Sequence, residues 1–138
     1  MKIVKIGNKT ISEQSRPFVI AEAGVNYYEL ASKMGISLLD AAKLMVKEAA
    51  DAGVDAIKFQ IYKAEKLASK YSRSYWDTTK EPTRSQYEFF KKYDKLTDDD
   101  YKQIADFAKD LGIVFMATPF DEQAVELVDR LSPVFKIA

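Results

Sequence analysis

The chain has 138 residues, enough for one small domain, and 47% of them are hydrophobic. Basic and acidic residues balance at 21 each, so the charge does not indicate nucleic acid or an anionic membrane as a partner. The absence of cysteine excludes disulfides and thiolate metal sites, and the absence of histidine removes the commonest general base and metal ligand. No signal-peptide pattern or membrane-spanning run is present, so we expect a cytoplasmic protein.

Short apolar runs alternate with stretches of helical periodicity along the chain. A leading hairpin is expected over residues 1–13, because two β-rich runs flank a Gly-Asn pair suited to a tight turn. The predicted strands that follow lie at 17–24, 55–62, 113–120 and 133–138. The predicted helices lie at 37–52, 85–92, 97–111 and 121–131.

Three of the helices begin with residues typical of a capping pair. These pairs are Ser37 with Asp40, Ser85 with Glu88, and Thr97 with Asp100. The polar connection over 63–84 is long for a compact domain, which predicts a functional or disordered segment.

The alternation of strands and amphipathic helices predicts a parallel sheet with right-handed crossovers. The chain contains no G-x-G-x-x-G motif after a strand and no Walker loop, so the nucleotide-binding folds lack their main signature. We therefore expect about four βα units after the hairpin, an arrangement that fits a parallel β/α (TIM) barrel.

A polar residue stands near the carboxyl end of each predicted strand. These residues are Glu22, Lys58 with Gln60, Thr118, and Lys136. Strand side chains alternate between the two faces, so the apolar residues between them point the other way, toward the helices. In a β/α barrel the inner face is catalytic at its carboxyl-terminal rim. The pattern predicts one polar mouth at that rim.

Simpler interpretations exist for each residue alone. A single strand lysine such as Lys58 or Lys136 is often an edge residue that reaches water. Glu22 could be a solvated strand end, and Thr118 could cap the turn before Pro119. The tyrosines and Trp76 are more typical of packing or partner contacts than of substrate stacking, and the acidic run 98–100 is typical of a helix start.

Three stretches together resemble the sialic acid synthase (N-acetylneuraminate synthase) family. They are VIAEAGVN, AGVDAIKFQ and FMATPFDEQAVELVDRLSPVFKIA, in the family's order. The resemblance covers about residue 18 to the last residue and implies a transferase of carbohydrate biosynthesis. Such enzymes condense phosphoenolpyruvate with an N-acylated amino sugar, such as N-acetylmannosamine, to give a nonulosonic acid and phosphate.

Carried over to this chain, the resemblance assigns Lys58, Thr118 and Lys136 to phosphoenolpyruvate binding. Two lysines and a hydroxyl suit a ligand that carries a phosphate and a carboxylate. It assigns Glu22 and Gln60 to the amino sugar, with Glu22 as the catalytic residue that orients the attacking water or the sugar carbonyl. Tyr27 departs from the family pattern, in which histidine often stands at that position.

The resemblance also implies a divalent metal, manganese or magnesium, whose ligands are not in this chain. The metal would polarise the sugar aldehyde for attack by phosphoenolpyruvate C3. Two alternatives stay open: a Schiff-base aldolase that uses Lys58 or Lys136, and a non-catalytic phosphosugar-binding or assembly subunit. Residues 1–138 resemble an incomplete half of the enzyme. We therefore expect a homo-oligomer or a complementary barrel half as partner.

Overall fold

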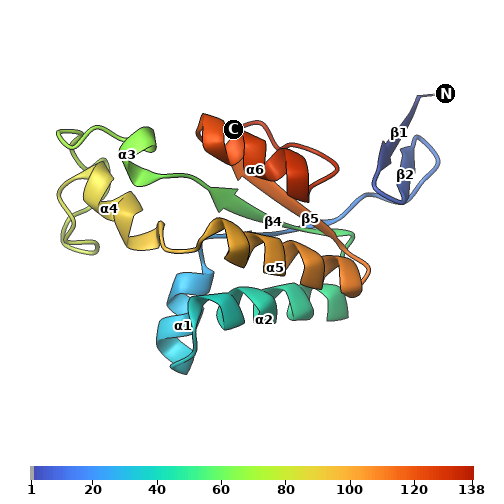
Figure 1. Cartoon of the computed structure of the whole chain (residues 1–138), viewed down its shortest axis with the longest axis horizontal. Helices are drawn as coiled ribbons and strands as arrows, with labels where there is room; N and C mark the ends of the chain where they lie inside the picture. The colour runs from blue at the N-terminus through green and yellow to red at the C-terminus, as the bar shows by residue number, and fades with distance from the viewer. Residues whose placement is uncertain (1) are drawn as a thin grey trace.

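Three parallel strands form the central sheet of the computed structural model, which describes residues 2–138 (Figure 1). In chain order the elements are β1 (Ile3–Ile6), β2 (Lys9–Ser12), β3 (Ile20–Gly24), α1 (Tyr27–Met34), α2 (Leu38–Asp51), β4 (Ala56–Ile61), α3 (Ala64–Leu67), α4 (Gln86–Tyr93), α5 (Asp98–Asp110), β5 (Val114–Pro119) and α6 (Glu122–Leu131). The sheet has the order β3-β4-β5. No helix within the described residues is both long and apolar enough to cross a bilayer.

The amino-terminal hairpin is confirmed, with β1 antiparallel to β2 and a turn at Gly7 and Asn8. Gly7 has a φ of 58°, a conformation that favours glycine. The predicted hairpin also included Met1, which lies outside the described residues. The hairpin stands apart from the helices at one end of the molecule (Figure 1).

The two faces of the sheet divide as the alternation predicted. Ile57, Phe59 and Phe115 belong to the main core, together with buried residues of α2, α5 and α6. The opposite face carries Ala56, Val114 and Met116, which are covered by Ile6, Phe18 and Val134. The rings of Phe59 and Phe115 stack with their centroids 5.7 Å apart. The face that carries Ile57, Phe59 and Phe115 therefore packs against the helices, and the polar strand residues belong to the other face.

Two of the three predicted helix caps are formed. The Ser37 hydroxyl accepts a hydrogen bond from the Asp40 N–H, and Thr97 with Asp100 forms a complete capping box. The Ser85 cap is wrong, because the Ser85 hydroxyl donates instead to the carbonyl of Lys70. Helix α4 therefore begins without a side-chain cap.

The predicted fourth strand at 133–138 is also wrong. Residues 133–138 have no regular structure, and residues 135–138 are exposed. One backbone hydrogen bond, from the Lys136 N–H to the Ala117 carbonyl at 3.4 Å, joins this segment to β5. A strand needs a repeated ladder of backbone hydrogen bonds, and Pro133 has no backbone N–H to donate to one. The structure thus holds three βα units rather than about four.

The connection between β4 and α5 is structured rather than disordered. It contains α3, α4 and an isolated antiparallel bridge between Arg73 and Ser85. Helix α1, which follows β3, was not predicted. It is held by packing, since Tyr27 and Ala31 are buried and Asn26 makes no side-chain cap.

Candidate active site

An ion pair between Lys58 and Glu22 lies at the centre of the candidate site. The two residues are direct partners in the register of β3 and β4. The Lys58 side chain is 11% exposed, whereas that of Glu22 is 55% exposed. A nearly buried ammonium group is therefore balanced by a carboxylate that reaches solvent. This pairing explains how a lysine is accommodated within the buried strand β4.

Gln60 and Thr118 form the second part of the site. They are partners in the register of β4 and β5, two residues beyond Lys58 and Met116. Thr118 is 3% exposed, and Gln60 is half-buried. Within residues 2–138 neither side chain makes a hydrogen bond, although the Gln60 backbone carbonyl accepts one from the Tyr101 hydroxyl at 3.3 Å. Both side chains therefore keep donors and acceptors free for a ligand.

Gly24 brings Glu22 and Gln60 together. The register of β3 shifts between Glu22 and Gly24, and Gly24 has a φ of 55°. A Cβ atom built on Gly24 would lie 3.7 Å from Glu22 Oε1 and 3.8 Å from Gln60 Nε2. The carboxylate and the amide thus converge over a position that has no side chain. Sequence reasoning missed Gly24, although a glycine at a strand end is a signal for a bulge.

Lys136 is the one predicted site residue that does not belong to a strand of the sheet. It is exposed, and its backbone rather than its side chain contacts β5. Of the five predicted residues, the structure brings Glu22, Lys58, Gln60 and Thr118 onto one face of neighbouring strands. Lys136 lies next to β5 through the Ala117 carbonyl, with no side-chain contact to the other four recorded among residues 2–138.

A set of tyrosines supports the carboxyl ends of the strands. The Tyr62 hydroxyl donates to the Phe90 carbonyl, and the Tyr27 hydroxyl donates to the Tyr93 carbonyl, both at 3.4 Å. These bonds attach α4 to the rim of the sheet. Burial raises the pKa of the Tyr27 hydroxyl and, more strongly, that of Tyr62, so both remain neutral donors. Tyr27, at the position where the family often has histidine, is a core residue here and is fully buried.

Two aspartates complete this attachment. Asp94, directly after α4, accepts hydrogen bonds from the Ala64 N–H at 3.0 Å and from Lys63 Nζ at 3.2 Å. Asp121 accepts from the Lys63 N–H at 2.8 Å and also caps α6 through the Ala124 N–H. Both carboxylates are therefore occupied by hydrogen bonds within the chain. No group of three or more acidic side chains within residues 2–138 is arranged to hold a metal ion.

A comparison with known protein families identifies the family to which the chain belongs. The sequence model of the NeuB family matches residues 45–138, which include β4, β5 and α6. The chain belongs to the NeuB family. The predicted resemblance to sialic acid synthases is thereby confirmed.

Two relatives of this NeuB family chain are named as synthases. It is 36% identical to N,N'-diacetyllegionaminic acid synthase of Legionella pneumophila over 83% of the chain and 30% of that protein. It is 34% identical to human N-acetylneuraminate-9-phosphate synthase over 87% of the chain and 32% of that protein. The chain therefore spans about a third of the length of the curated relatives it matches.

The fold of this NeuB family chain is also found in a solved structure. N-acetylneuraminic acid (sialic acid) synthetase from Leptospira borgpetersenii superposes with a TM-score of 0.73 at 26% identity. The match covers 99% of the chain and 41% of the synthetase. The parallel α/β arrangement of residues 2–138 is thus that of one part of a larger synthetase.

Proposed function

We propose that this chain supplies part of the active site of a synthase that condenses phosphoenolpyruvate with an N-acylated amino sugar. The product would be a sialic or related nonulosonic acid, with release of phosphate. The observation that carries the proposal is the Lys58–Glu22 ion pair on one face of the parallel sheet, beside the free side chains of Gln60 and Thr118 near the carboxyl ends of their strands. In parallel α/β folds this edge of the sheet is where ligands bind.

Phosphoenolpyruvate fits the cationic side of the site. The Lys58 ammonium group would donate to its carboxylate or phosphate, and the Thr118 hydroxyl would donate a second hydrogen bond. Because Lys58 is nearly buried, its interaction with an anion is less screened by water than that of a surface lysine. Lys136, exposed beside β5, would supply the second positive charge.

The amino sugar fits the side of the site formed by Glu22 and Gln60. The Glu22 carboxylate can accept from a sugar hydroxyl or hold the water that adds at C2 of phosphoenolpyruvate. The Gln60 amide can donate to a carbonyl oxygen and accept from an N–H, which suits an N-acyl group. The open position at Gly24 leaves room between these two side chains.

The divalent metal implied by the family does not fit the residues present. Within the described part of the chain, Glu22 is ion-paired with Lys58, and no three acidic residues form a metal-binding group. We therefore assign the residues of this chain to binding the two substrates and to orienting the reacting groups.

Two other functions would use the same residues differently. A Schiff-base aldolase needs a neutral amine for attack on a carbonyl, whereas Lys58 is ion-paired with Glu22. Borohydride treatment in the presence of pyruvate would trap an aldolase as a stable adduct and would leave a synthase unmodified. A non-catalytic subunit would bind sugar phosphates without releasing inorganic phosphate.

The decisive experiment uses phosphoenolpyruvate labelled with ¹⁸O at the bridging oxygen. A protein that contains this chain is incubated with the labelled compound, N-acetylmannosamine and manganese, and the released phosphate is analysed by mass spectrometry. Label in the phosphate supports condensation with C–O cleavage. Unlabelled phosphate, or phosphate released equally without the sugar, contradicts the proposal.

A further inference from the structure

The hydroxyl group of Tyr101 lies behind the candidate site and contacts the main chain of a site residue. Tyr101, on α5, is 6% exposed and belongs to the main core, which covers the face of the sheet opposite the polar side chains. Its hydroxyl donates a hydrogen bond to the Gln60 backbone carbonyl at 3.3 Å. Tyr101 therefore reaches Gln60 from the helix side of the sheet, whereas the Gln60 side chain belongs to the other side.

Gln60 lies beyond the point where β3 supports β4. The last residue of β3 that pairs with β4 is Gly24, opposite Phe59, and Gln60 is paired with Thr118 of β5. A Cβ atom built on Gly24 would lie 3.8 Å from Gln60 Nε2, so the Gln60 amide extends over the end of β3. The backbone that carries this amide is therefore paired with β5 on one side, and Tyr101 supplies a further hydrogen bond to its carbonyl.

Lys58, two residues earlier on β4, is supported on both sides. It is paired with Glu22 of β3 and with Met116 of β5, and its side chain forms the ion pair with Glu22. The end of β4 that carries Gln60 can therefore move without displacing Lys58. The two sides of the candidate site thus differ in what holds them in place.

Tyr101 is itself fixed by the start of α5. It directly follows the capping box formed by Thr97 and Asp100. Leu96 and Tyr101 are both buried in the main core and have the spacing of a hydrophobic staple, which fixes how the chain enters a helix. Burial raises the pKa of the Tyr101 hydroxyl well above its ordinary value, and the neighbouring Tyr27 raises it further, so the group remains a neutral donor.

We propose that Tyr101 is a positioning residue for the amino-sugar side of the site, acting through its hydrogen bond to the Gln60 carbonyl. The inference rests on the proposed function, in which the Gln60 amide binds the N-acyl group of the sugar. Without the hydroxyl, the end of β4 has more freedom, and the amide meets the N-acyl group less often in the correct orientation. Binding of phosphoenolpyruvate by Lys58 is retained, because Lys58 is held by β3 and β5.

The first test needs no catalysis and uses nuclear magnetic resonance on the ¹⁵N-labelled 138-residue chain. The side-chain amide signal of Gln60 is identified by its loss in Gln60→Glu, and its order is measured in Tyr101→Phe. Tyr62→Phe is the matched control, because Tyr62 is also buried and its hydroxyl donates at 3.4 Å to the backbone carbonyl of Phe90 in α4. The order of the Gln60 amide falls in Tyr101→Phe and stays unchanged in the control. An unchanged order in both variants, or an equal fall in both, overturns the proposal.

The second test measures condensation kinetics in a protein that contains this chain, with each substrate varied in turn. Tyr101→Phe raises the KM for N-acetylmannosamine about two- to tenfold and leaves the KM for phosphoenolpyruvate unchanged. In the Gln60→Ala background the same substitution has little further effect, because it acts through Gln60. Effects of the two substitutions that add independently, or equal rises in both KM values, overturn the positioning role. A protein without condensation activity contradicts the proposed function, and the resonance measurement then decides whether Tyr101 holds Gln60.

Discussion

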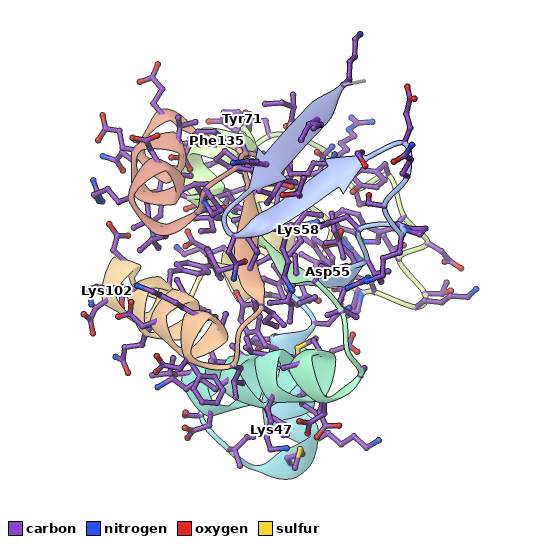
Figure 2. All side chains as sticks on the ribbon, turned by 90° about the vertical axis from the view of Figure 1, so that its right-hand side faces the viewer. Lys47, Asp55, Lys58, Tyr71, Lys102 and Phe135 are labelled. Atoms are coloured by element: carbon purple, nitrogen blue, oxygen red, sulfur yellow. The ribbon has the colours of Figure 1, made fainter. Side chains whose placement is uncertain are left out.

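Arg16 and Asp55 form a two-point ion pair that fastens the segment after the hairpin to the start of β4. The two guanidinium nitrogens of Arg16 lie 2.8 and 2.6 Å from the Asp55 carboxylate oxygens. The same carboxylate accepts from the Val19 N–H at 2.9 Å and lies 3.8 Å from Lys9 Nζ. Asp55 is 3% exposed, so one buried carboxylate joins β2, the entry to β3 and β4. In Figure 2 Lys58 and Asp55 are labelled below the hairpin, and in the sequence Asp55 directly precedes β4 while Lys58 lies within it.

Replacing Asp55 is expected to destabilise the fold without touching the candidate site. Asp55→Ala removes charge-assisted hydrogen bonds and leaves the Val19 N–H without its acceptor, a loss of about 2–3 kcal/mol in the free energy of unfolding. Urea denaturation measures the change. Asp51→Ala is the control, because Asp51 is exposed and pairs with the exposed Lys47 on the same helix. Equal effects of the two substitutions would contradict the structural role of Asp55.

The same carboxylate predicts a pH dependence. Hydrogen bonds from Arg16 and Val19 lower the pKa of Asp55 below its ordinary value. Its contribution to stability is therefore fully present above the pKa of the unfolded chain, at about 4, and is lost as the pH falls through the lower folded pKa. Denaturation curves measured between neutral and acidic pH should show a smaller acid-induced loss for Asp55→Asn than for the unchanged chain. The variant is compared with the unchanged chain because Asp55 is not the sole carboxylate whose pKa is lowered among residues 2–138. Hydrogen bonds from Lys92 and Thr83 lower the pKa of Glu81 to about 2. Parallel pH profiles would count against the ion pair.

Lys58→Ala should weaken binding of phosphoenolpyruvate more than binding of the amino sugar. The lost charge-assisted hydrogen bond corresponds to about 1.5–3 kcal/mol, or about ten- to a hundredfold in Kd. Titration calorimetry with each substrate measures both effects. Lys102→Ala serves as the control, since Lys102 is exposed on α5. A change in sugar affinity alone would show that the assignment of Lys58 is wrong.

The alternation of strand side chains was sufficient to predict the two faces of the sheet. Because the period of a strand is strict, placing Ile57 and Phe59 toward the helices also places Lys58 and Gln60 on the other face. The capping residues at Ser37 and Thr97 were equally informative, since each bonds within its own helix turn. These features depend on residues that are close together in the sequence, so a single sequence is enough to predict them.

The remaining features depend on contacts between distant residues. The register shift at Gly24 arises from how β3 pairs with β4, which alternation within one strand does not record. Helix α1 forms around buried Tyr27, and tertiary packing overrides the weak helix propensity of tyrosine there. The segment that contains Lys136 has strand-like composition but only one backbone bond to β5. Its predicted membership of the site therefore stays a prediction.

The connection between β4 and α5 should depend on Trp76 for its order. Trp76→Phe retains an aromatic ring but removes both indole hydrogen bonds, to Glu81 and Thr83. We expect trypsin to cleave this variant faster after Arg73, Lys80 or Arg84, while its unfolding transition changes little, because local opening exposes the connection without opening the main core. Initial cleavage rates followed by mass spectrometry provide the measurement. An unchanged cleavage pattern would show that Trp76 does not hold the connection.

The 138-residue chain by itself is expected to bind phosphoenolpyruvate but not to catalyse condensation. The physical reason is that the site is one-sided: Lys58, Gln60 and Thr118 lie on three-stranded sheet β3-β4-β5, and no metal-binding group of acidic residues occurs within residues 2–138. The chain also spans about a third of the length of its curated relatives. Phosphate release is measured with phosphoenolpyruvate, N-acetylmannosamine and manganese, and calorimetry measures binding in the same preparation. Binding that is lost in Lys58→Ala, together with no phosphate release, is the expected result. Turnover by the chain alone would show that these strands suffice for the chemistry.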